Sequence, residues 1–168
     1  MLEELKEELW RQFGASLDMF ENALRQCPDN LWEGKDKFWY NAYHTLFYTD
    51  YYSTIEPDNF HPPQPFTSSE FEPDGTMQER VYTKEELLEY TQYCREQCRI
   101  MIAGLTPEKA KLRWINKWKN YSMIEIIIYN MRHVQHHVGQ LNFLLGQIDH
   151  DLPIWVSQTK EVLNTKLN

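Results

Sequence analysis

The sequence predicts an all-α protein in which four long amphipathic helices form a bundle. Two observations favour this fold class. Apolar residues recur at steps of three and four along most of the chain, which is the spacing of one face of a helix. Two segments also begin with the Ser/Thr-x-x-Glu pattern of a capped helix N-terminus, and we find no clear strand. A length of 168 residues fits one domain, residues 1–168, with one buried core.

The first helix should run from Leu2 to about Arg25. It should end before Pro28, because proline breaks a helix interior. The following stretch, "PDNLWEGKDK", is typical of a connector. The apolar stripe of this helix consists of Leu2, Leu5, Leu9, Phe13, Leu17, Phe20 and Leu24.

A second helix is expected from Lys37 to Ile55, where the sequence contains no helix breaker. Its many aromatic residues would also suit strands. The length of the uninterrupted run favours a helix.

The segment from Glu56 to Tyr82 has no periodicity and predicts a long irregular loop between the second and third helices. Connections of this length inside a compact domain are often functional lids or linkers. A linker needs a domain on each side, and neither flank is large enough, so we expect a loop that folds across one domain and partly covers its site. The breakers in it are Pro57, Pro62, Pro63, Pro65, Pro73 and Gly75.

The third helix should begin near Lys84, because Thr83 and Glu86 form a capping box, and it should end near Gly104. Cys94 and Cys98 lie four residues apart on it. This spacing would suit a soft metal or a redox pair. Both cysteines lie on the apolar stripe, however, and free cysteine is often simply buried, so we favour the core interpretation.

The fourth helix should run from Met123 to about Leu145. Ser122 and Glu125 form the capping box at its start, and Gly146 is the expected stop. Beyond it, Pro153 at a helix start predicts a short C-terminal helix.

Composition narrows the function classes. The net charge of −8 and the lack of a Lys/Arg-rich run argue against nucleic acid as a partner. No segment resembles a signal peptide or is apolar enough to span a bilayer, so we expect a cytoplasmic protein with no membrane partner. Three cysteines without a regular framework argue against a disulfide-stapled secreted protein.

The stretch "MRHVQHHVGQ" holds three of the six histidines of the chain. On a helical wheel, His133 and His137 lie about 40° apart, on or at the edge of the apolar face. His136 lies about 60° off on the other side and is the weaker candidate. Two imidazoles at i and i+4 can bind one metal ion together. The alternative is a pair of core histidines whose polar rings find hydrogen-bond partners.

A tight metal site needs a third ligand from another element. The expected second helix offers His44, although an ordinary interior histidine would look the same. His61 and His150 lie in the loop and beyond the fourth helix, where we expect exposed, non-specific roles.

Three polar residues could support such a site. Asn130 and Gln140 lie near the face of the fourth helix that carries the histidine pair and could orient the imidazoles. Asp50 lies about 120° around its helix from His44, so we do not expect it to be a ligand on the same face. It could instead support the site or lie near a helix end.

A histidine in "YHTLFYTD", the "HVQHHVGQLNFLLGQ" run and the "LW" pair of Leu31 and Trp32 together resemble the DinB/YfiT-like superfamily. The resemblance covers most of the chain and implies a bundle with up-down-down-up topology. Members of this family commonly hold a divalent metal on three histidines, which by position are His44, His133 and His137 here. Homodimers are also common in the family.

The resemblance implies a metal-dependent enzyme acting on a small molecule. Some relatives resemble hydrolases. Others resemble isomerases or S-transferases that use a low-molecular-weight thiol such as bacillithiol, mycothiol or a glutathione-like compound. Imidazole ligands suit several transition metals, of which we expect Zn or Ni. The competing hypotheses are a non-catalytic stress-response protein that binds a metal or ligand, and a plain helical homodimer with unmetallated histidines.

Overall fold

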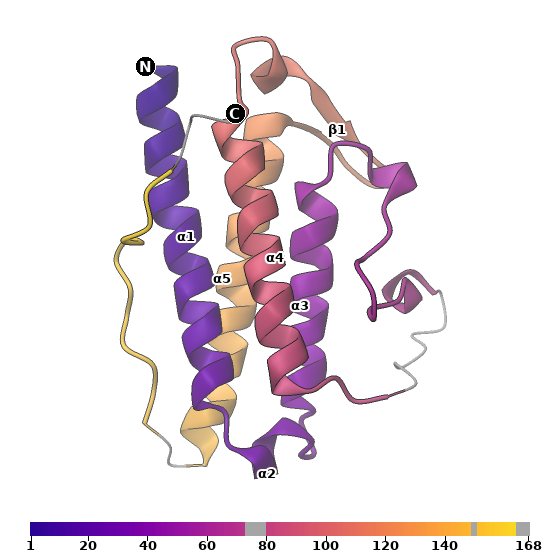
Figure 1. Cartoon of the computed structure of the whole chain (residues 1–168), viewed down its shortest axis with the longest axis vertical. Helices are drawn as coiled ribbons and strands as arrows, with labels where there is room; N and C mark the ends of the chain where they lie inside the picture. The colour runs from indigo at the N-terminus through magenta and orange to yellow at the C-terminus, as the bar shows by residue number, and fades with distance from the viewer. Residues whose placement is uncertain (73–79, 149–150, 164–168) are drawn as a thin grey trace.

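The computed structural model describes residues 1–72, 80–148 and 151–163. Most of these residues are helical, so the prediction of a helical fold is confirmed. Four long helices lie side by side (Figure 1). They are α1 (Leu2–Gln26), α3 (Phe38–Ser53), α4 (Lys84–Ala103) and α5 (Met123–Gln147).

The core forms where these helices meet. Both α1 and α3 pack against α4 and α5. Aromatic residues fill much of the interior, because the amphipathic stripes of the helices turn inward and exclude water. The largest fully buried aromatic side chains are Trp10, Trp114, Tyr43, Tyr82, Tyr90, Phe13, Phe20, Phe38 and Phe47.

Both predicted capping boxes are present. The Thr83 hydroxyl accepts from the Glu86 amide at 3.2 Å, and the Glu86 carboxylate accepts from the Thr83 amide at 2.9 Å. The same reciprocal pair joins Ser122 and Glu125. Each box satisfies amides that the first turn leaves without partners, and this is why α4 and α5 begin at the predicted residues.

The expected stop at Gly146 is wrong, because α5 continues through it to Gln147. The C-cap residue that follows it, Ile148, has a φ of −105°, which is not left-handed, so no glycine-dependent cap is formed. The connector after α1 contains a short helix, α2 (Asp29–Trp32).

A short β-hairpin corrects the expectation of no strand. Strands β1 (Arg113–Ile115) and β2 (Asn120–Ser122) pair antiparallel and lead directly into α5. In the turn, the Asn116 side chain accepts from the amides of Trp118 and Lys119 at 2.9 and 2.7 Å. Trp114 anchors the hairpin, since its ring is buried and its Nε1 donates to the Thr54 carbonyl at 2.9 Å.

The predicted C-terminal helix is also wrong. Residues 151–163 contain no helix and run along α1 instead. The Thr159 amide donates to the Arg11 carbonyl at 3.0 Å, and Trp10 Nε1 donates to the Glu161 carbonyl at 3.0 Å. Gly14 permits this close approach, because a Cβ there would lie 2.5 Å from Thr159 Cγ2. These contacts with α1 override the local signal of Pro153.

The described part of the long loop is irregular apart from two 3-10 turns, η1 (Pro57–Asn59) and η2 (Ser69–Phe71). Pro73 and Gly75 lie outside the described residues. A third such turn, η3 (Lys109–Lys111), precedes the hairpin.

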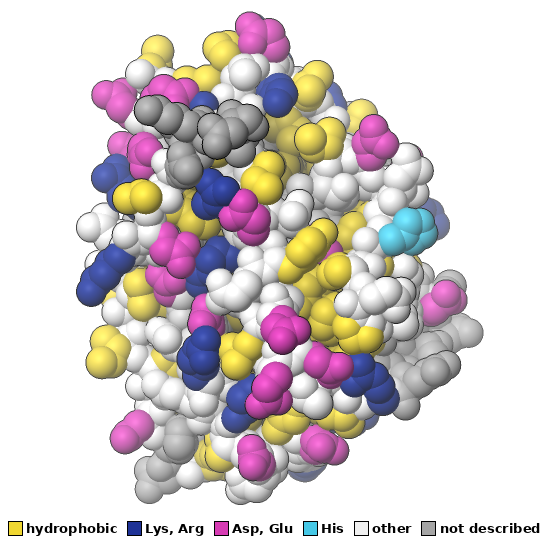
Figure 2. Space-filling model, in the orientation of Figure 1, with side chains coloured by type: hydrophobic (Ala, Val, Ile, Leu, Met, Phe, Trp, Pro, Cys, Tyr) yellow, Lys and Arg dark blue, Asp and Glu magenta, His cyan; other side chains and the backbone are white. Residues whose placement is uncertain are grey.

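The outer surface is mixed in charge. On the face in Figure 2, Lys and Arg side chains are interspersed with Asp and Glu and form no continuous basic patch. Within the described part of the chain, no helix is both long and apolar enough to cross a bilayer.

Candidate metal centre

The three histidines predicted as metal ligands come together between α3 and α5. His44 lies on α3, and His133 and His137 lie one turn apart on α5. Each offers a ring nitrogen, and the three nitrogens lie within 4.8 Å of one another. The ring centroids of His133 and His137 are 4.6 Å apart, and that of His44 lies 5.0 Å from His137 and 5.9 Å from His133. The packing of α3 on α5 therefore assembles a group that could hold one ion.

His133 is the deepest of the three. Among the described residues, neither of its ring nitrogens has a hydrogen-bond partner, although both are buried. The rings of Tyr48 and Tyr52 flank it at centroid distances of 6.0 and 5.7 Å. Burial, followed by the charges of the neighbouring histidines, lowers the pKa of His133 to about 2, so the ring is neutral at physiological pH. A buried polar group with no partner requires an explanation, and a bound ion is one.

His137 is held from outside the cluster. Its Nδ1 lies 3.0 Å from Asn41 Oδ1 and 2.7 Å from Gln140 Oε1. Both partners are acceptor oxygens, so Nδ1 carries the proton and Nε2 keeps its lone pair. Burial first, and then the nearby His44, lower the pKa of His137 to about 4, which keeps this ring neutral as well.

His44 has the same arrangement with a different partner. Its Nδ1 lies 2.7 Å from Glu70 Oε2, in the turn η2 of the long loop. Its side chain is 33% exposed, so the cluster reaches solvent on the side of His44. The predicted contact between the loop and the site is therefore present in the described part of the loop.

These features fit a divalent ion of the zinc or nickel kind. Zinc sites in proteins use neutral imidazoles whose second nitrogen donates to a carboxylate or carbonyl oxygen. His44 and His137 are arranged in this way, and His133 has both nitrogens available. Among residues 1–72, 80–148 and 151–163, no fourth His, Cys, Asp or Glu joins the group. Three protein ligands leave a coordination position for water or substrate, as in catalytic zinc sites.

Two other histidines, His136 and His61, lie outside the group. His136 is exposed, as the helical wheel predicts, and its Nε2 lies 3.3 Å from Gln140 Nε2. His61 is exposed in the loop. His150 lies outside the described residues.

Of the three residues predicted to support the site, one contacts a histidine of the group and two do not. Gln140 does orient an imidazole, that of His137. Asn130 does not, because its amide donates to the Thr49 carbonyl and the Ser53 hydroxyl at 2.9 and 3.1 Å. Asp50 is buried away from the histidines and accepts from the Tyr90 hydroxyl at 3.0 Å.

Cys94 and Cys98 are buried free thiols, so the core interpretation is confirmed. Burial raises the pKa of the Cys98 thiol to about 12 and also raises that of Cys94. Neither thiol is therefore poised to react.

Sequence reasoning missed two residues of the site, Asn41 and Glu70. Asn41 lies three residues before His44 and so shares its face of α3, a spacing that could have identified it. Glu70 follows no spacing rule, because an irregular loop brings it to the site.

A groove adjoins the cluster on the outer side of α5. Its volume is about 460 Å³, and it includes Asn41 and Gln140, the two side chains that hold His137. The remaining lining residues are Asp36, His136, Gly139, Phe143 and Leu144. A molecule in this groove would be separated from His137 by the side chain of Asn41 or Gln140.

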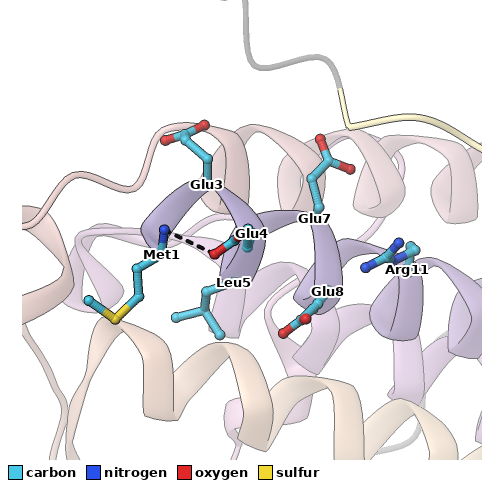
Figure 3. Close-up of a pocket in the computed structure, with 7 residues that line it drawn as sticks. All are labelled: Met1, Glu3, Glu4, Leu5, Glu7, Glu8 and Arg11. Atoms are coloured by element: carbon cyan, nitrogen blue, oxygen red, sulfur yellow. Dashed lines mark ion pairs between the residues drawn. The ribbon is translucent and has the colours of Figure 1, made fainter.

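A different hollow, of about 750 Å³, lies at the start of α1 and contains no histidine (Figure 3). Four glutamates and Arg11 point outward there, and Glu4 pairs with the N-terminal amine at 3.0 Å. This is a solvated acidic surface rather than a site.

Comparisons with protein-family models, with curated proteins and with solved structures gave no match.

Proposed function

We propose that this protein is a metal-dependent enzyme of the DinB/YfiT-like kind, which binds a divalent ion through His44, His133 and His137. The observation that carries the proposal is the His133 ring beside the other two histidines, because both of its nitrogens are buried with no hydrogen-bond partner among the described residues. A core histidine would be expected to have its polar atoms satisfied. An ion shared by the three imidazoles would give one of the two His133 nitrogens a partner.

The arrangement of the helices supports the up-down-down-up bundle that belongs to this proposal. In Figure 1, α3 and α4 run in one direction, and α1 and α5 run in the other. The long loop is then the crossover that lets α3 and α4 run in parallel, while the short hairpin joins α4 to α5.

The proposed chemistry follows from the three-ligand set. A bound ion would lower the pKa of a water molecule toward neutrality or hold a thiolate. The chain itself orients two of the ligands, His137 through Asn41 and Gln140, and His44 through Glu70. The groove that begins at Asn41 and Gln140 is the proposed site for the small-molecule substrate. We therefore propose a hydrolase or a thiol-dependent S-transferase, with Zn or Ni as the metal and, for a transferase, a low-molecular-weight thiol as cofactor.

A purely structural or storage role for the metal is the alternative. A structural zinc site usually closes its shell with four protein ligands. Three histidines beside a groove favour catalysis instead, and His44 keeps the cluster partly open to solvent.

Metal analysis of protein purified without a nickel column tests the binding step. We expect about one equivalent of Zn or Ni per chain, and loss of most of it in His137→Ala. The matched control is His136→Ala, which removes the adjacent exposed imidazole and should keep the metal. Trace metal in wild type, unchanged by His137→Ala, would refute the proposal.

Activity assays of the metal-loaded protein separate the two reactions. Turnover that requires an added thiol indicates a transferase, and turnover of an ester or amide without thiol indicates a hydrolase. Loss of turnover in His137→Ala, but not in His61→Ala, whose imidazole is exposed in the loop, ties it to the proposed centre. The homodimer also belongs to the proposal, and light scattering of the purified protein tests it.

A further inference from the structure

Glu70 has a buried acidic side chain in the long loop between α3 and α4. Its side chain is 4% exposed, whereas Glu72, two residues on, is exposed. Removing a carboxylate from water is costly unless it gains partners. The contacts around Glu70 therefore show what its burial achieves.

Three tyrosines of α3 fix this part of the loop. The Tyr43 hydroxyl donates to the Thr67 carbonyl at 2.8 Å, and the Tyr48 hydroxyl donates to the Glu70 carbonyl at 3.3 Å. Tyr40 lies near the Glu70 carboxylate, since burial, and then the proximity of Glu70, raise the pKa of Tyr40 to about 12. Among the described residues, Oε2 of this carboxylate is bonded to His44 and Oε1 is buried without a hydrogen-bond partner. The backbone and the carboxylate of Glu70 are thus both held against α3.

The carboxylate is aimed at His44, with Oε2 lying 2.7 Å from Nδ1. A carboxylate accepts hydrogen bonds, so Nδ1 of His44 carries a proton, and in the neutral ring the lone pair then lies on Nε2. Nδ1 is occupied by Glu70, and Nε2 is the atom left for a metal. Carboxylates placed in this way fix the tautomer and the ring orientation of ligating histidines and raise their basicity.

We propose that Glu70 is a positioning residue of the metal centre, which holds His44 in the Nδ1-protonated form with Nε2 directed at the ion. This inference rests on the proposed metal site and deepens it. It assigns the loop between α3 and α4 a function, which is to deliver a carboxylate to the histidine that comes from the other helix. His137 receives the equivalent support from Asn41 and Gln140 without a charge.

Metal affinity of the purified full-length variants provides the first test. Apo-protein is titrated with Zn²⁺ by calorimetry against a competing chelator. Glu70→Ala should bind about 10–100-fold more weakly than wild type, the usual effect of removing such a partner. Glu70→Gln keeps an acceptor oxygen and should recover most of that loss. Glu72→Ala, the matched exposed control, should bind within twofold of wild type. Unchanged affinity in Glu70→Ala would overturn the proposal.

The tautomer of His44 provides a second readout that needs no metal. Long-range ¹H–¹⁵N spectra of histidine-labelled apo-protein should show His44 protonated at Nδ1 in wild type and in Glu72→Ala. Glu70→Ala should shift it toward the Nε2-protonated form. A purely structural role for Glu70 would leave this signal unchanged, and circular dichroism shows whether the variant is folded. If Glu70→Ala does not fold, the decision passes to Glu70→Gln, which must keep the Nδ1 proton.

The two measurements distinguish failure of the proposed function from failure of the role assigned to Glu70. Wild type that binds no metal refutes the proposed function, and the positioning role is then decided by the tautomer alone. Wild type that binds metal, with the Nδ1-protonated His44 retained in Glu70→Ala, refutes only the role of Glu70.

Discussion

Replacing His133 by leucine separates the stability lost by burying this imidazole from its proposed role in binding metal. Both ring nitrogens are buried without a hydrogen-bond partner in the described structure. A polar group in that state costs about 1–3 kcal/mol, and a volume-conserving apolar replacement costs less than about 1.5 kcal/mol. We therefore expect metal-free His133→Leu to have a free energy of unfolding about 1 kcal/mol above that of wild type at pH 7.5.

The pH dependence of this difference has a definite sign. The pKa of His133 falls from 6.5 to about 2 on folding. Below pH 6.5 the unfolded chain binds a proton that the folded chain does not bind until about pH 2, so stability is lost as the pH falls through this window. At pH 5 the loss is about 2 kcal/mol. The advantage of leucine over His133 should therefore grow by about that amount between pH 7.5 and pH 5.

Bound metal should reverse this difference and make wild type more stable than His133→Leu. A ligand that binds only the folded state stabilises it by about 2.7 kcal/mol at 100 times its Kd. Wild type should gain this stability from Zn²⁺, and His133→Leu, with two histidines left, should gain much less.

Urea denaturation measures all of these differences, with EDTA and with excess Zn²⁺, at pH 7.5 and pH 5. His136→Leu, at an exposed position outside the cluster, should follow wild type in its response to metal. A His133→Leu variant less stable than wild type in EDTA, or with an unchanged pH dependence, would refute the reasoning.

Three further substitutions test the core and the C-terminal segment. Burial raises the pKa of Asp50 from 3.8 in the unfolded chain to about 7 in the folded protein. The stability that protonated Asp50 contributes to the fold is therefore fully present below pH 3.8 and is lost as the pH rises through 7. Asp50→Asn cannot ionise and should gain up to about 4 kcal/mol over wild type between pH 4 and pH 8 in urea denaturation, and a flat difference would contradict this. Gly14→Ala should speed hydrogen exchange of the Thr159 amide, because the new Cβ would overlap Thr159 Cγ2 at 2.5 Å. Gly139→Ala, whose new Cβ would meet nothing within 4 Å, should instead raise the free energy of unfolding by about 1 kcal/mol. An equal change in the free energy of unfolding for Gly14→Ala and Gly139→Ala would contradict the packing.

Local signals explain which parts of the fold could be predicted. The starts of α4 and α5 follow from capping boxes, in which residues three apart satisfy each other, so no tertiary information is needed. The hairpin could not be predicted in this way, because three-residue strands carry little pattern and Trp114 is fixed by α3. The segment of residues 151–163 depends on the space that Gly14 leaves on α1, which no local pattern reports.

The same division applies to the site. His133 and His137 share one helix, so a helical wheel is enough to pair them and to set His136 aside. His44 could be named from the second helix only as a candidate, which the family resemblance then strengthened, because its distance from α5 is decided by packing. Glu70 lies on an irregular loop, and the contacts that aim it at His44 exist only in three dimensions.

The aromatic content of α3 acquires a reason from this site. Tyr40, His44, Tyr48 and Tyr52 follow one another at steps of four and form one stripe of the helix. Tyr40 approaches the Glu70 carboxylate, and Tyr48 contacts both His44 and His133 at centroid distances of 4.8 and 6.0 Å. Tyr52 contacts His133 at 5.7 Å from deeper in the protein. A stripe whose aromatic residues would also suit a strand thus supplies one candidate ligand, the anchor of the loop and aromatic rings that flank the nitrogens of His133.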